Sequence, residues 1–220
     1  MKSFKRSLAV LLLGVAALAV SAASASAALP EFSVLKNTFT VTSGAGTLET
    51  SGAAKVKVTC TSDTAAGEVT AAKTVSKGSV LFKGCESAAS KCTTSGLSEG
   101  EVKTVELLGT LGYISASKKE VGLRLEPASG KANNFAEFTC GTKKITVKNA
   151  VIGAITPVNT STKSYTYTLE QTKGVQAIKA FEGGVEEVLL TTVEGGESAA
   201  KSGIKSVESI TASTAGEIKA

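Results

Sequence analysis

Residues 107–125 read LLGTLGYISASKKEVGLRL, and this stretch decides the fold class. Its first part, 107–114, is a dense apolar run broken by two glycines, typical of a central strand in which glycine permits a bulge or a close backbone approach. Its last part, 121–125, alternates apolar and polar residues with the period of two that marks a half-buried strand. We therefore predict that these two segments pair as strands across a turn at 115–120.

The same alternation recurs along most of the chain, with turn-forming residues between the segments. Further strands are predicted at 38–42, 55–60, 136–140, 145–148 and 164–169. Turn signals are found at Ser43-Gly44, Ser62-Asp63, Lys77-Gly78, Ser129-Gly130, Cys140-Gly141, Gly183-Gly184 and Gly195-Gly196. This spacing predicts an all-β fold, an antiparallel β-sandwich or partly open barrel with little or no helix. A single helical turn is considered at Ser198–Lys201.

The N-terminus has the layout of a secretory signal peptide. Three basic residues, Lys2, Lys5 and Arg6, precede an apolar stretch of about 13 residues, which is shorter than the roughly 20 needed to span a bilayer. Small residues follow, and we predict cleavage after Ala27, with Ala25 as the alternative. Residues 1–27 are thus predicted to be removed and residues 28–220 to form a single all-β domain that is secreted, with no membrane span left after cleavage.

Composition excludes several classes of function. Without residues 1–27 the chain has 21 basic and 19 acidic residues, a net charge of +2, and Arg124 is its only arginine. Because arginine is the residue best suited to phosphate and guanine recognition, no nucleic-acid partner is expected. The chain has no histidine and no tryptophan, and Asp63 is its only aspartate. Serine–histidine triads, the usual zinc sites and aspartic dyads therefore cannot form, and we expect no metal, no cofactor and no catalytic residues.

Four cysteines, Cys60, Cys85, Cys92 and Cys140, in an exported chain predict two disulfides. Three pairings are possible. We favour Cys85 with Cys92, which closes a short loop, and Cys60 with Cys140, because both lie in alternating segments that direct their side chains toward the same core.

Few residues remain as candidates for chemistry. Glycoside hydrolysis needs two carboxyl groups on either side of one bond. Two glutamate combinations stay open, Glu99 with Glu101 and Glu137 with Glu182, whereas the adjacent Glu186 and Glu187 would point in opposite directions on a strand. Tyr165 and Tyr167 share one strand face, so they form either an aromatic ligand platform or part of the core with their hydroxyls at its rim.

Several motifs resemble those of uncharacterised secreted β-rich proteins of soil actinobacteria. They are Gly109-Thr-Leu-Gly-Tyr-Ile114, Val121-Gly-Leu123, Phe138-Thr-Cys-Gly141, Val151-Ile-Gly-Ala-Ile-Thr-Pro-Val-Asn159, Phe181-Glu-Gly-Gly184 and Glu217-Ile-Lys-Ala220. The resemblance implies export and a sandwich-like β-fold, and it implies no activity. The sequence thus predicts a secreted, non-enzymatic structural or binding module, whose partner could be a cell-envelope glycan or protein. The alternatives are a histidine-independent glycosidase using two glutamates and a self-assembling surface protein.

Overall fold

The structure, a computed structural model, describes residues 30–52, 56–196 and 198–220. The predicted signal peptide, residues 1–27, lies outside the described residues. The described part of the chain forms strands and no helix, and its buried residues make one contiguous hydrophobic cluster. The predicted all-β class is therefore confirmed.

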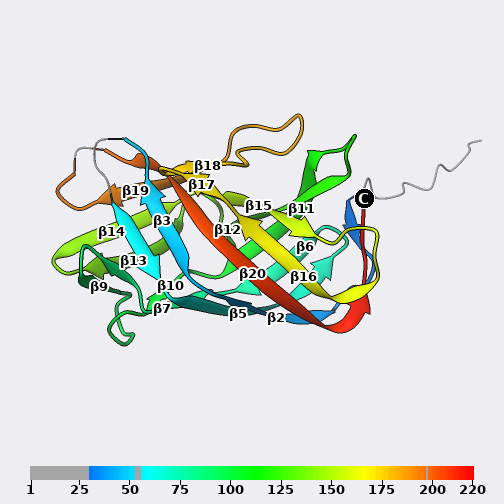
Figure 1. The fold of residues 1–220 in the computed structure, drawn as a ribbon, viewed down its shortest axis with the longest axis horizontal. Helices are drawn as coiled ribbons and strands as arrows, with labels where there is room; N and C mark the ends of the chain where they lie inside the picture. Colours follow the sequence, from blue (N-terminus) through cyan, green and yellow to red (C-terminus); the bar gives the residue numbers. More distant parts are fainter. Residues whose placement is uncertain (1–29, 53–55, 197) are drawn as a thin grey trace, which may run out of the picture.

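Eight antiparallel strands form a closed barrel, called here the first barrel (Figure 1). Each strand pairs with two neighbours, so that the series of pairings returns to the strand where it began. In order around the barrel, they are β2 (Thr38–Ser43), β5 (Ser62–Ala71), β6 (Thr74–Gly78), β11 (Leu107–Ser115), β12 (Glu120–Pro127), β15 (Val151–Thr156), β16 (Thr162–Leu169) and β20 (Ala200–Gly216). Of the two predicted architectures the fold is thus a barrel, and the barrel is closed rather than partly open.

A second ring of paired strands continues from the first barrel and shares β20 with it. In order, its other members are β3 (Gly46–Thr50), β4 (Lys57–Cys60), β8 (Glu86–Ser87), β9 (Ser90–Thr93), β13 (Asn134–Cys140), β14 (Lys143–Lys148) and β19 (Leu189–Val193). Six shorter strands extend or close the rings: β7 (Leu81–Lys83), β10 (Val102–Lys103), the pair β1 (Glu31–Phe32) and β21 (Ile218–Lys219), and the pair β17 (Gln171–Thr172) and β18 (Val175–Gln176).

Strand β20 joins the two rings. Its N-terminal part lies between β19 and β3, and the rest lies between β16 and β2, so it runs diagonally from one ring to the other in Figure 1. The helical turn considered at Ser198–Lys201 is therefore wrong. Ala200 and Lys201 already pair with Thr191 and Leu190 of β19, because sheet hydrogen bonds are available on that side.

The hairpin predicted from residues 107–125 is confirmed as β11 and β12. Leu111 pairs with Leu123 and Tyr113 with Val121. The side chains of Leu111, Val121 and Leu123 are buried inside the barrel. Gly112 pairs with Gly122 on the outer face.

A segment without regular structure, residues 177–188, covers that outer face and is called here the strap. The Phe181 ring lies over the pair of glycines, since a Cβ built on Gly112 would come within 2.6 Å of ring atoms. Glu187 of the strap accepts hydrogen bonds from Arg124 (3.1 Å) on β12 and from Lys131 (2.8 Å). The outer face of β12 is therefore packed rather than solvated.

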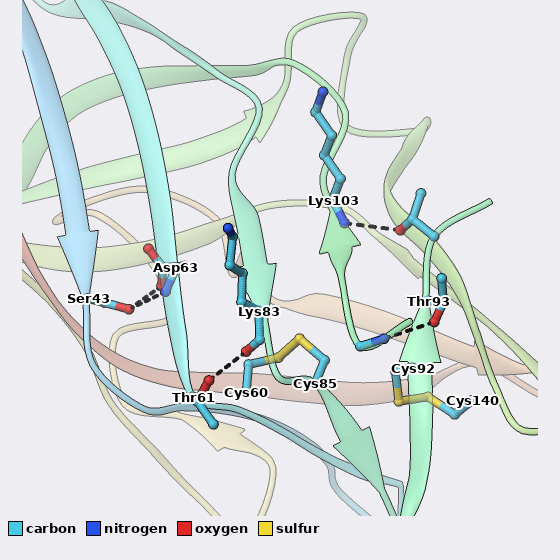
Figure 2. Close-up of a disulfide and its surroundings, with 12 residues drawn as sticks. Ser43, Cys60, Thr61, Asp63, Lys83, Cys85, Cys92, Thr93, Lys103 and Cys140 are labelled. Atoms are coloured by element: carbon cyan, nitrogen blue, oxygen red, sulfur yellow. Dashed lines mark hydrogen bonds between the residues drawn. A yellow bond between two sulfur atoms is a disulfide. The ribbon is translucent and has the colours of Figure 1, made fainter. Parts of the chain in front are cut away.

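The four cysteines form two disulfides, Cys60–Cys85 and Cys92–Cys140 (Figure 2). The favoured pairing of Cys85 with Cys92 and Cys60 with Cys140 is wrong. All four lie in one row across β4, the β8–β9 hairpin and β13, in the order Cys60, Cys85, Cys92, Cys140.

This row explains the pairing. Neighbouring strands are about 4.8 Å apart, so Cys60 and Cys140, at the two ends of the row, are separated by about 14 Å. A disulfide requires Cα atoms within about 7 Å. Once the cysteines stand in this row, only the observed pairing bonds all four.

Candidate functional site

The two tyrosines singled out in the sequence lie at one end of the first barrel. Tyr165 and Tyr167 both point into the barrel from β16, because alternate residues of a strand face the same side. Together they line a cavity of about 50 Å³. The remaining lining is mostly apolar: Phe32, Ser33, Val34, Asn37, Phe39, Val69, Val75, Leu123, Ile155, Ile210, Ala212, Gly216, Glu217 and Ile218.

A two-stranded cap formed by β1 and β21 contributes to this cavity. Phe32 of β1 pairs with Ile218 of β21, and both side chains line the cavity. The Ser33 amide donates to the Glu217 carbonyl (2.9 Å), and the Glu217 amide donates to Ser33 Oγ (2.8 Å). The Phe32 amide donates to the Ala72 carbonyl (2.7 Å) beyond the end of β5. The loop between β15 and β16 also holds the cap, because the Asn159 amide donates to the Ile218 carbonyl (2.8 Å) and the Ala220 amide donates to Asn159 Oδ1 (2.9 Å).

Asn37 and the two tyrosine hydroxyls at the cavity have hydrogen-bond partners within the protein. Asn37 donates to the Thr214 carbonyl (2.8 Å) and accepts from the Thr214 amide (3.0 Å). The Tyr165 hydroxyl donates to the Gly216 carbonyl (2.6 Å), and the Tyr167 hydroxyl donates to the Leu123 carbonyl (3.1 Å). A ligand in the cavity would therefore gain mainly apolar contacts.

Burial changes the acidity of both tyrosines. It raises the pKa of Tyr167 well above its ordinary value near 10, and the nearby Glu208 carboxylate raises it further. The pKa of Tyr165 is also raised, by partial burial and by Glu217. Both phenols stay protonated at neutral pH. Their rings pack against the apolar lining, and their hydroxyls donate hydrogen bonds to backbone carbonyls.

Alkaline pH is expected to destabilise the fold through Tyr167. A raised folded-state pKa means that the contribution of this tyrosine to stability is complete below about pH 10 and is lost as the pH rises further. The free energy of unfolding, measured by urea titration from pH 8 to about pH 11, should fall above pH 10. The slope should be shallower in Tyr167→Phe, and equal slopes would contradict the assignment.

Glu137 and Glu182, one of the two glutamate combinations left open by the sequence, bind different partners on separate elements. Glu137 on β13 binds Lys144 (2.8 Å), whereas Glu182, in the strap, accepts from the Ala116 amide at the tip of the β11–β12 hairpin. The Lys144 pKa is raised by its hydrogen bond to Glu137. Glu101 lies 3.9 Å from Lys83 and also accepts from the Ser98 amide.

Glu186 and Glu187 do point to different partners, although they lie in the strap and not on a strand. Glu186 binds Lys201 (3.1 Å), and Glu187 binds Arg124 (3.1 Å) and Lys131 (2.8 Å). These carboxylates are thus committed to ion pairs on separate elements.

Sequence reasoning missed a row of buried polar side chains in the first barrel. Asp63, Ser43, Glu208 and Tyr167 lie side by side on β5, β2, β20 and β16, and the Ser43 hydroxyl donates to the Asp63 carboxylate. Asp63 is only 1% exposed and Glu208 only 3%. The turn predicted at Ser62-Asp63 is therefore wrong, since both residues belong to β5. The only signal for this row in the sequence was the period-two alternation of the neighbouring strands. Because aspartate is polar, Asp63 was not recognised as a buried strand residue.

The described residues include no group of three or more Cys, Asp or Glu side chains arranged to hold a metal ion. A larger surface groove, of about 290 Å³, lies beside β10 and β13. Its lining combines apolar residues such as Val105 and Phe138 with Lys103 and the exposed pair of Lys144 with Glu137, and the groove is more open to solvent than the capped cavity. The capped cavity is therefore the better-formed candidate site.

No family model matches the chain, and no curated protein or solved structure matches it either. The resemblance to secreted actinobacterial proteins stays a prediction. Two disulfides indicate an oxidising, non-cytoplasmic compartment. Within the described residues there is no helix long and apolar enough to cross a membrane.

Proposed function

We propose that the protein is a secreted, non-enzymatic binding module of the cell envelope or extracellular space, and that its site is the capped cavity of the first barrel. The observation that carries this proposal is the cavity itself, which is mostly apolar in its lining and is bordered by Asn37 and two tyrosine hydroxyls that already have hydrogen-bond partners. Eight-stranded barrels are wide enough either to be filled by side chains or to hold one small ligand. The ligand is an apolar molecule or the apolar end of a larger one.

The size of the cavity limits what binds without rearrangement. At about 50 Å³ it is roughly a third of the 150 Å³ cavity that holds benzene in an engineered protein. A chain of several carbons must therefore displace the cap in part, while each buried methylene contributes about 0.8 kcal/mol. For a six-carbon alcohol at roughly 0.5 kcal/mol per non-hydrogen atom, a dissociation constant of about 1–10 mM is expected.

Titration with 1-hexanol, followed by amide chemical shifts of the protein without residues 1–27, tests the proposal. Shifts should concentrate on β1, β16, β20 and β21. The variant Ala212→Leu places three further carbons in the cavity and should weaken binding at least tenfold. Ala66→Leu, the same change at an exposed position of β5, should leave binding unchanged. Hexanol shifts spread over other elements, or equal binding by Ala212→Leu, would refute the site.

A further inference from the structure

The charge at the cavity is carried by one residue. Among the described residues that line the cavity, Glu217 is the only one with a charged side chain. It lies between β20 and β21, and its backbone is fixed by hydrogen bonds to Ser33 in both directions. Glu217 is half-buried and is one of the residues that line the cavity.

The two charged residues of β1 and β21 pair with each other. On the cap, Lys219 and Glu31 lie opposite each other in the β1–β21 pair, and their charged atoms are 4.0 Å apart. Within the described residues, the ion pairs of the protein do not include Glu217. The field of Glu217 reaches into the cavity, because its charge helps to raise the pKa of Tyr165.

We propose that the ligand of the capped cavity carries a cationic group at the end that stays beside Glu217, as in an alkyl chain ending in an ammonium group. This inference rests on the proposed function and specifies its ligand. The apolar chain would contact Phe32, Tyr165 and Ile218, while the ammonium group would remain hydrated next to the carboxylate. A carboxylate in that place would be repelled by Glu217.

Three ligands with the same six-carbon chain separate the charge preference from apolar binding. Hexylammonium, 1-hexanol and hexanoate are titrated at pH 7 into the wild type, Glu217→Gln and Glu194→Gln. Glu194→Gln makes the same change of charge at an exposed position just after β19, at the other end of the molecule (Figure 1). It therefore controls for the net charge of the protein.

The wild type and Glu194→Gln should bind hexylammonium about fivefold more tightly than hexanoate, the size expected for one solvated ion pair. Glu217→Gln should abolish this preference. Equal or tighter binding of hexanoate by the wild type would overturn the inference, as would a preference that persists in Glu217→Gln. Binding of 1-hexanol without any charge preference would leave the proposed function standing, whereas failure of all three ligands would refute both.

Discussion

Replacing Cys92 and Cys140 together by alanine is expected to lower the free energy of unfolding by about 4 kcal/mol. This disulfide closes a loop of 48 residues, for which the chain-entropy relation gives a contribution of that size. The two strands that it joins, β9 and β13, share only two residue pairs. The pairing of β9 with β13 alone therefore contributes little to closing the second ring.

Thermal unfolding would show the loss as a decrease in Tm of roughly 8–16 °C. Removing Cys60 and Cys85 serves as the comparison, because that bridge closes a loop of 25 residues and should contribute about 3.5 kcal/mol. The Cys60–Cys85 bridge links β4 to the β8–β9 hairpin, and β4 and β8 form only one residue pair. A decrease of less than about 2 °C for the Cys92 and Cys140 variant would mean that packing alone closes the ring.

Arg124→Met is expected to cost about 3 kcal/mol, although methionine keeps much of the side-chain volume. Arg124 binds Glu187 (3.1 Å) of the strap and Glu126 (2.9 Å), whose side chains are only 8% and 12% exposed. Removing one partner of a buried ion pair leaves a desolvated charge behind, which is more costly than the pair is stabilising. Lys131 retains its contact with Glu187 and limits the loss.

Lys144→Met is the matched control for this prediction. It removes an ion pair with Glu137 whose two side chains are 48% and 44% exposed, so the free energy of unfolding should change much less than in Arg124→Met. Urea unfolding of both variants at neutral pH gives the comparison. Equal effects would show that the contact between the strap and β12 is no more buried in solution than a surface ion pair.

The presence of two disulfides was predicted from the number of cysteines, whereas the hairpin of β11 and β12 and the strands around Val41 and Tyr167 were predicted from local patterns. These features depend on residues close together in the chain, where alternation and turn chemistry act directly. Tyr165 and Tyr167 were correctly placed on one face. The cavity that they line was not predictable, because Phe32, Leu123 and Ile218 come from segments far apart in the sequence.

The sequence by itself determined the antiparallel β-class and the excluded chemistries, since period-two alternation and a missing residue type are properties of the chain alone. Tertiary structure decided which cysteines bond, because only closure of the second ring places all four in one row. It also decided the orientation of β20. Glu208 is buried and Val207 is 55% exposed, although valine is the more hydrophobic of the two residues. Their orientation follows from the alternation of β20, which directs Ile204, Ile210 and Ala212 inward.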